Sequence, residues 1–242
     1  MLTVCVLLYG DYLQLAQRVL APLERELQAG QLVDLRIGMN AVGDATASYV
    51  DSLETKYPTQ IVRYQSAENV YKYPLMRRMF YDLARPLKQF TAWFDDDSFI
   101  RKPDGCWTGQ VVDKMLGRDM VGGIYVMPLK AAQRDWVEDQ PWYKGQSVRG
   151  PNYRTKFCTG GFWVIRSALL RQYNWPLTTL KHRGGDVMLG ELLRQQGKKI
   201  ESDTLGVAIN ADAAGNESRS PRRGYDEQPI GVDYRRQTII KP

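Results

Sequence analysis

The sequence predicts an α/β fold in which helices cover a mostly parallel sheet, and two observations lead to this prediction. Apolar segments with strand periodicity alternate with helical segments over the first hundred residues, in the order β-α-β-α-β-α-β. That order is typical of parallel sheets in a single domain. Polar and acidic residues also follow directly after several of the strands. A length of 242 residues with 43% apolar side chains fits one large domain or two small ones.

Each expected element has a sequence signal. Alternation or a short apolar run predicts strands at 2–8, 33–39, 60–64, 90–94 and 120–127. Helices are expected from Leu13 to a stop at Gly30 and over 45–56. A third helix is built on Met76, Met79, Phe80 and Leu83 and ended by Pro86. A further helix begins at Asp186 and stops at Gly197.

Three consecutive carboxylates, Asp95, Asp96 and Asp97, follow the apolar strand at 90–94. They repel one another unless solvent, donors or a cation neutralises them. Mg²⁺ and Mn²⁺ take such oxygen ligands, usually together with substrate phosphates. In an extended segment Asp95 and Asp97 point the same way, so we expect them to face one ion. The alternative is a solvated acidic turn.

Other polar residues stand at the ends of neighbouring strands. Tyr9, Gly10 and Asp11 follow the first strand, and Asn40 closes the second. Ligands of parallel sheets bind beyond the carboxyl ends of the strands. The sequence therefore predicts a ligand site at this edge, with these residues and the carboxylates around it.

The composition favours a protein of a reducing, cytoplasmic compartment with no membrane segment. Three widely spaced cysteines indicate no disulfide framework, and no apolar run is long enough to span a bilayer. The run at 2–8 lacks a basic flank and is interpreted as a strand rather than a signal peptide. A net charge of +6 and a pI near 9.2 indicate an acidic partner such as a nucleotide, a nucleic acid or an anionic surface.

The second half carries a basic and aromatic segment. Residues 141–183 contain no Asp or Glu, while Lys, Arg and aromatic residues are interleaved in them. Trp142, Tyr143, Arg149 and Arg154 are the candidate ligand-binding residues of this segment. Stacking rings and cations suit a nucleic acid, although aromatic rings also suit a sugar or a peptide.

Three short motifs in order resemble those of GT-A glycosyltransferases. Residues 93–97 (Trp-Phe-Asp-Asp-Asp) resemble the Asp-x-Asp motif, and residues 158–164 (Cys-Thr-Gly-Gly-Phe-Trp-Val) resemble the Gly-Gly segment that follows it. Residues 184–190 (Gly-Gly-Asp-Val-Met-Leu-Gly) resemble the later acidic motif that opens a helix, with Gly185 where many relatives carry a second acid. The resemblance covers about residues 1–205 and implies a GT-A (Rossmann-like) fold.

The resemblance also implies roles. Asp97, assisted by Asp95, would hold Mn²⁺ or Mg²⁺ on the diphosphate of a nucleotide-sugar, and Asp186 would be the general base. Tyr9 would stack on the nucleobase, and Lys72, Arg77 or Arg78 would reach phosphate. The donor-binding set is Tyr9, Gly10, Asp11, Asn40, Lys72, Arg77, Asp96, Gly160 and Gly161.

Structural alternatives stand beside several of these roles. Lys72 and the arginines could form a solvated helix face, and Gly160-Gly161 could form an ordinary turn. Asp186 could be a helix N-cap. His182 is either an ordinary loop residue or a contact to the metal or the acceptor.

The expected function is a metal-dependent, inverting glycosyltransferase that uses a UDP-sugar. Residues 1–100 would bind the donor and 101–205 the acceptor, with 206–242 as a tail. The charge favours DNA as acceptor, as in phage enzymes that glycosylate 5-hydroxymethylated pyrimidine bases. The alternatives are a glycan, lipid-linked sugar or protein acceptor, a nucleotidyltransferase, and a non-catalytic nucleotide- or nucleic-acid-binding module.

Overall fold

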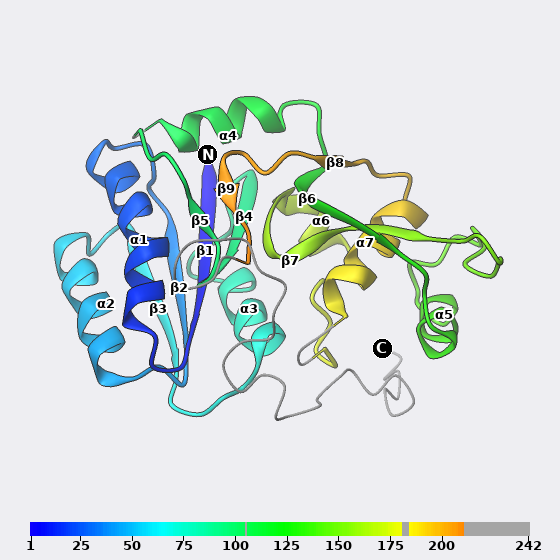
Figure 1. Ribbon diagram of the computed structural model, residues 1–242, viewed down its shortest axis with the longest axis horizontal. Coiled ribbons are helices and arrows are strands. Elements are labelled where there is room, and N and C mark those ends of the chain that lie inside the picture. Colours follow the sequence, from blue (N-terminus) through cyan, green and yellow to red (C-terminus); the bar gives the residue numbers. More distant parts are fainter. Residues whose placement is uncertain (105, 181–183, 211–242) are drawn as a thin grey trace.

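A seven-stranded sheet runs through both halves of the chain in the order β3-β2-β1-β4-β7-β6-β8 (Figure 1). The computed structural model describes residues 1–104, 106–180 and 184–210. The helices within these residues lie on both faces of the sheet, and a small two-stranded ribbon lies at its side.

The N-terminal half is the predicted parallel unit. Its strands are β1 (Leu2–Tyr9), β2 (Leu35–Asn40), β3 (Ile61–Ser66) and β4 (Phe90–Asp95), and they pair with one another in parallel. The helices between them are α1 (Leu13–Gln28), α2 (Asp44–Lys56) and α3 (Lys72–Phe80). The fold class and these four strands confirm the prediction.

The second half extends the same sheet with a change of direction. β7 (Thr155–Arg166) pairs antiparallel with both β4 and β6 (Met120–Met127), and β8 (Ile200–Ser202) pairs parallel with β6. β5 (Phe99–Ile100) and β9 (Val207–Ala208) form the separate ribbon. The remaining helices are α4 (Trp107–Met115), α5 (Ala131–Glu138), α6 (Ser167–Gln172) and α7 (Gly185–Gln195).

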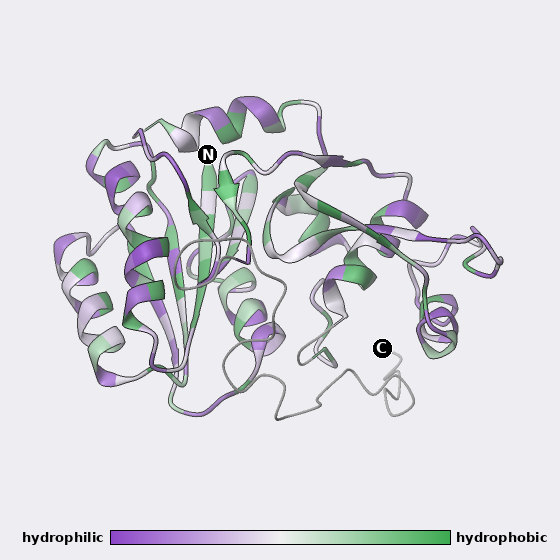
Figure 2. Cartoon of the chain, in the orientation of Figure 1, coloured by the Kyte–Doolittle hydropathy of each residue, from purple (hydrophilic) through white to green (hydrophobic). Residues whose placement is uncertain are grey.

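Two apolar layers, one on each face of the sheet, form the core. In β4, Phe90, Ala92 and Phe94 face the layer packed by α1, α2 and α4, whereas Trp93 faces the layer packed by α3, α6 and α7. Figure 2 shows the hydrophobic residues concentrated in the central strands, with hydrophilic bands along the helices. Burial on both faces explains why these strands read as almost continuous apolar runs.

The structure corrects the prediction for α3. The helix runs from Lys72 to Phe80, and Leu83, which the helical spacing places on its apolar face, is 95% exposed. The helical spacing of Met76, Met79, Phe80 and Leu83 therefore predicted a helix that extends past its observed end at Phe80. Among the described residues, no helix is both long enough and apolar enough to cross a bilayer.

Candidate active site

The carboxyl ends of β1, β2 and β4 lie side by side at one edge of the sheet. Tyr9 is in register with Asn40, and Leu7 is in register with Asp95. The backbone N–H of Tyr9 donates to Oδ2 of Asp96 at 3.4 Å. The polar residues that follow the strands in sequence therefore meet in space.

The three aspartates form a turn rather than a continued strand. β4 ends at Asp95, and the N–H of Ser98 donates to the Asp95 carbonyl oxygen at 3.0 Å. Asp96 and Asp97 are the two central residues of this turn, Asp96 buried and Asp97 partly exposed. The assumption of an extended segment, from which we expected Asp95 and Asp97 to point the same way, is therefore wrong beyond Asp95.

Lys72 occupies the centre of the site. Its Nζ lies 2.7 Å from each carboxylate oxygen of Asp95 and 2.6 Å from the carbonyl oxygen of Gly160. The ammonium also lies 5.4 Å from the ring centroid of Trp93, whose indole N–H donates to Asp95 at 2.8 Å. The side chain is only 10% exposed, so the alternative of a solvated helix face is wrong for Lys72.

Asp186 lies beside this ammonium, in the first turn of α7. The N-cap of the helix is Gly184, with φ of 85°, so the alternative that Asp186 is the N-cap is wrong. A Cβ placed on Gly160 would lie 3.2 Å from Nζ of Lys72 and 3.6 Å from Oδ2 of Asp186, and the two side chains therefore approach the same glycine. Lys72, Asp95, Gly160 and Asp186 form what we call the central cluster.

The surroundings of Asp186 favour its protonated form. Burial raises the pKa of this carboxyl, and the ammonium of Lys72 opposes the rise. Hydrogen bonds from the backbone N–H groups of Asp186 and Val187 also lower the pKa, yet the net direction is upward. A carboxyl with a raised pKa is suited to take a proton at neutral pH.

Tyr73 fixes the start of α7 and explains the departure at Gly185. The N–H of Asp186 donates to Oη of Tyr73 at 3.1 Å. A Cβ on Gly185 would lie 2.3 Å from Cζ of the Tyr73 ring, which leaves no room for a side chain at this position. No pattern in the sequence marks Tyr73, because its neighbour in space is more than a hundred residues away.

Gly160 and Gly161 lie inside β7, so the alternative of an ordinary turn is wrong. A Cβ on Gly161 would come within 2.5 Å of Oδ1 of Asn210 and 2.8 Å of Oγ of Ser98. Glycine is thus needed where the β7 backbone is closely approached by the turn after β4 and by the segment after β9.

Asp95 and Asp97 fit a divalent cation of the Mg²⁺ or Mn²⁺ type. The described residues contain no group of three or more His, Cys, Asp or Glu that could hold an ion by itself. Such ions commonly use one or two carboxylates and complete their coordination with substrate phosphate and water. Each carboxylate oxygen has two lone pairs, so the contacts of Asp95 with Lys72 and Trp93 leave it acceptor capacity.

Several of the other predicted donor residues lie at or just after the ends of β1 and β2. Gly10 has φ of 65°, and its N–H donates to the Asn40 carbonyl oxygen at 3.4 Å. The carboxylate of Asp11 lies against Gly43, the N-cap of α2. Arg77, by contrast, donates from Nη1 to the Pro176 carbonyl oxygen at 2.7 Å and ties α3 to that loop, so its guanidinium is already engaged away from the cluster.

The predicted acceptor residues do not form one stacking and cationic surface. Trp142 is 6% exposed and packs edge-on against Trp136 in the core, whereas Tyr143 is partly buried against the same layer. The exposed Arg149 pairs with Asp135 and, through two nitrogens, with Glu138. Arg154 is exposed and donates to the Tyr153 carbonyl oxygen at 2.9 Å.

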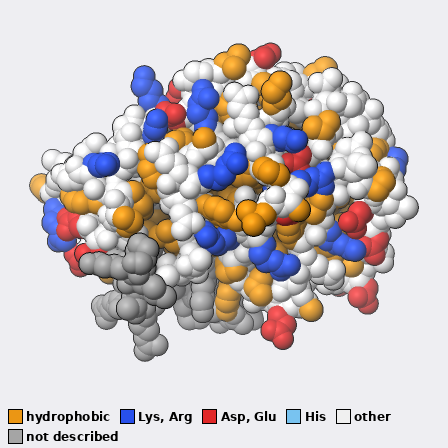
Figure 3. Space-filling view, turned by 180° about the vertical axis from the view of Figure 1, so that it is seen from behind, with side chains coloured by type: hydrophobic (Ala, Val, Ile, Leu, Met, Phe, Trp, Pro, Cys, Tyr) orange, Lys and Arg blue, Asp and Glu red, His pale blue; other side chains and the backbone are white. Residues whose placement is uncertain are grey.

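Among residues 141–180, Arg149 and Arg166 pair with acids from other segments, so the basic bias of this segment is weaker in space than in sequence. Figure 3 shows Lys and Arg side chains dispersed over one face among hydrophobic and uncharged ones, rather than gathered in a single stripe. His182 and the tail arginines Arg219, Arg222, Arg223, Arg235 and Arg236 lie outside the described residues.

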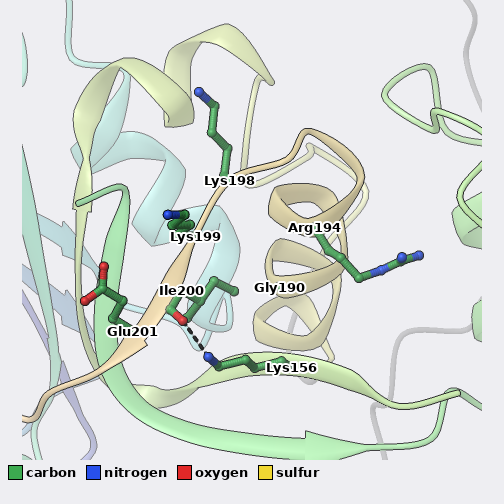
Figure 4. A pocket seen from close by; sticks show the side chains of 7 residues that line it. All are labelled: Lys156, Gly190, Arg194, Lys198, Lys199, Ile200 and Glu201. Atoms are coloured by element: carbon green, nitrogen blue, oxygen red, sulfur yellow. Dashed lines mark hydrogen bonds between the residues drawn. The ribbon is translucent and has the colours of Figure 1, made fainter. Parts of the chain in front are cut away.

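A hollow of about 500 Å³ opens between β7, α7 and β8, lined by Lys156, Gly190, Arg194, Lys198, Lys199, Ile200 and Glu201 (Figure 4). Its cations do not converge: Lys156 donates to the Ile200 carbonyl oxygen at 2.6 Å, and Arg194 pairs with Glu191 at 2.7 Å. Figure 4 shows Lys198 and Arg194 pointing away from one another. The central cluster is therefore the better candidate for chemistry.

No protein-family model and no curated protein sequence matches the chain. Solved structures do match its fold. A mannosyltransferase from Pyrobaculum calidifontis, in complex with GDP-Man and Mn²⁺, aligns with a TM-score of 0.57 and 13% identity over 84% of this chain and 54% of its own. GalNAc-T7, with UDP, GalNAc and Mn²⁺, aligns with a TM-score of 0.62 and 11% identity over 91% and 45%.

Residues 1–349 of S. aureus TarS align with a TM-score of 0.50 and 11% identity over 84% of this chain and 58% of that one. The chain thus spans about half the length of the proteins that it resembles. At these identities the similarity concerns architecture, and it shows that the chain has the GT-A fold.

Proposed function

We propose that the protein is a metal-dependent glycosyltransferase that moves a sugar from a nucleoside diphosphate sugar to a hydroxyl of an acceptor. The observation that carries the proposal is the central cluster, in which Lys72, Asp95 and Asp186 meet at the carboxyl edge of a GT-A sheet. That edge is where ligands of such sheets bind. The similar folds solved with GDP-Man or UDP and with Mn²⁺ support this choice of donor and ion.

Asp186 is the general base in this proposal. It takes the proton of the acceptor hydroxyl while the oxygen attacks the anomeric carbon, and the nucleoside diphosphate leaves from the opposite face. The sugar carbon is therefore inverted. The raised pKa of Asp186 brings the carboxyl closer to the operating pH, which favours proton transfer.

Asp97, with Asp95 sharing its oxygens, holds the divalent ion. When bound, this ion acts as a Lewis acid on the diphosphate. Lys72 adds a fixed positive charge beside Asp95, where negative charge on the leaving group develops. In this proposal Tyr9 and Asp11, at the end of β1, contact the nucleobase and ribose, and we expect uridine as the base.

The acceptor is the part of the function with the least structural support. The charge of residues 141–183 favours DNA, but Trp142 is buried and Arg149 is paired with two acids. The remaining support for a 5-hydroxymethylated base in DNA is the net charge of +6. Glycan, lipid-linked sugar and protein acceptors therefore belong in the same test.

The deciding experiment is hydrolysis of a panel of UDP- and GDP-sugars with Mn²⁺, read as release of the nucleoside diphosphate. Release that disappears with a chelator and with Asp97→Ala supports the proposal. Release of pyrophosphate from a nucleoside triphosphate and a sugar phosphate indicates a nucleotidyltransferase. Donor binding without turnover for any acceptor indicates a binding module.

The acceptor is tested with the same preparation. A gel shift over a salt series with plain and hydroxymethylated duplexes measures binding, and each phosphate contact should contribute a slope of about −0.9 in log K against log salt. Mass spectrometry of the digested nucleosides then detects an added hexose. No shift at low salt and no hexose would remove DNA as the acceptor.

A further inference from the structure

Tyr71 has a backbone conformation that only glycine adopts readily. Its φ is 66° and its ψ is 178°, and it immediately precedes the first residue of α3. For a residue with a Cβ, this region is disfavoured by about tenfold or more in population. The conformation persists only if surrounding contacts hold it, and such residues cluster at functional sites.

Two asparagine side chains supply these contacts. Oδ1 of Asn69 accepts from the N–H of Tyr71 at 2.9 Å and from Nδ2 of Asn40 at 2.9 Å. Oδ1 of Asn40 in turn accepts from the N–H of Val70 at 2.9 Å. We call Asn40, Asn69 and the backbone of residues 70 and 71 the asparagine clasp.

The clasp has a rigid base. Asn40 is the last residue of β2, is 1% exposed and pairs in register with Tyr9. Nδ2 of Asn69 also donates to Oη of Tyr9 at 3.4 Å, so the same amide contacts the end of β1. The turn before α3 is thus fastened to the sheet edge that carries the candidate donor site.

The clasp ends where the central cluster begins. Lys72 follows Tyr71 directly, and its ammonium bonds Asp95 and Gly160. The rest of α3 is held independently, because Leu75 and Met76 are fully buried in the core. Release of the clasp should therefore free Lys72, the first residue of the helix, without unseating the helix.

We propose that Asn69 is a positioning residue: it locks the strained backbone of Tyr71, and this lock keeps the ammonium of Lys72 on Asp95 and Gly160. Asn69 does not touch the reacting atoms. Its effect on turnover rests on the proposed function, whereas its effect on the placement of Lys72 does not.

The test measures the placement of Lys72 directly in the full chain. An amine-reactive reagent labels lysines, and mass spectrometry compares Lys72 with the exposed Lys114 as an internal reference. Asn69→Ala should label Lys72 about tenfold faster than wild type. Adding Tyr71→Gly should return the rate to within about twofold of wild type, because glycine adopts this conformation without the clasp.

The matched control combines Asn69→Ala with Tyr71→Ala. Alanine removes the Tyr71 ring, as glycine does, but its Cβ keeps the backbone strained at this φ, so Lys72 should still be labelled fast. Asn69→Asp, which keeps the accepting oxygen, should stay protected and serves if the alanine variant does not fold. An unchanged labelling rate of Lys72 in Asn69→Ala overturns the proposal. Equal protection of Lys72 when Tyr71→Ala or Tyr71→Gly is added to Asn69→Ala also overturns it. Where donor turnover is found, kcat should be low in the variants whose Lys72 labels fast and near wild type in those whose Lys72 is protected, with little change in KM. The labelling result can be interpreted without a turnover measurement.

Discussion

Asp186→Asn separates the chemical role of this residue from any structural one. The change removes the acid–base function and keeps the size of the side chain. Loss of a general base costs about 10²–10⁴-fold in rate, which corresponds to about 3–5 kcal/mol of transition-state stabilisation. Donor affinity should change little, because the proton is transferred from the acceptor.

The same substitution should raise stability at neutral pH. Burial raises the pKa of Asp186 in the folded protein above its unfolded value, so the folded state binds that proton more tightly. The contribution of Asp186 to the free energy of unfolding is therefore fully present when the pH is below the ordinary pKa of 3.8. This contribution is lost as the pH rises through the pKa of the folded state. A tenfold difference in proton affinity between the folded and unfolded states corresponds to about 1.4 kcal/mol, and 1 kcal/mol moves Tm by about 2–4 °C in a domain of this size.

Two measurements check these expectations. Thermal unfolding of wild type and Asp186→Asn across pH should show a higher Tm for the variant at pH 7 and convergence of the two below about pH 4. The kcat of wild type should rise with pH through an acid limb above the usual aspartate range, whereas the variant should show no such limb. Near-normal turnover of the variant, or a lower Tm at pH 7, would refute the assignment.

Three other substitutions test the surrounding structure. Asp97→Ala should abolish Mn²⁺-dependent donor affinity while leaving the unfolding transition intact; calorimetry with a UDP-sugar measures it, and unchanged affinity would place the ion elsewhere. Gly185→Ala should cost about 1–3 kcal/mol in urea unfolding, because its Cβ would lie 2.3 Å from the Tyr73 ring. The control Gly109→Ala lies in α4, where the added Cβ would be 3.8 Å from Oε1 of Gln31, and it should be neutral or stabilising. Glu191→Ala should cost about 3 kcal/mol, since this carboxylate is fully buried and accepts several hydrogen bonds; a loss below about 1 kcal/mol would contradict that reasoning.

The parallel half of the fold could be predicted because its signals are local. Each strand of β1 to β4 is a short apolar run that ends at polar residues, and each helix between them has its own periodicity. The β5–β9 ribbon, by contrast, pairs residues 99 and 100 with 208 and 207. Two-residue strands have no periodicity, and only the folded chain brings such segments together.

The candidate site shows the same division. The strand ends and Asp186 are marked by motifs, whereas the environment of Lys72 depends on Gly160, which is 88 residues away. A lysine at the start of a helix is usually expected to be solvated, and nothing local to Lys72 reveals its partly buried partner, Asp95. Arg149 shows the same limit: it lies in a segment without acids, but its guanidinium pairs with Glu138, which precedes that segment.

The pairing of β7 with β4 explains why the two halves of the chain form one structural unit. Phe94 lies opposite Phe162, and Trp93 stacks on Trp163 with ring centroids 6.2 Å apart. That register brings Gly160 next to the end of β4, where the ammonium of Lys72 bridges it to Asp95. Residues 1–100 alone would leave the long apolar edge of β4 unpaired, which is the condition under which strands aggregate. Residues 1–100 therefore depend on the second half of the chain for a paired sheet edge, as well as for the general base that the proposed reaction requires.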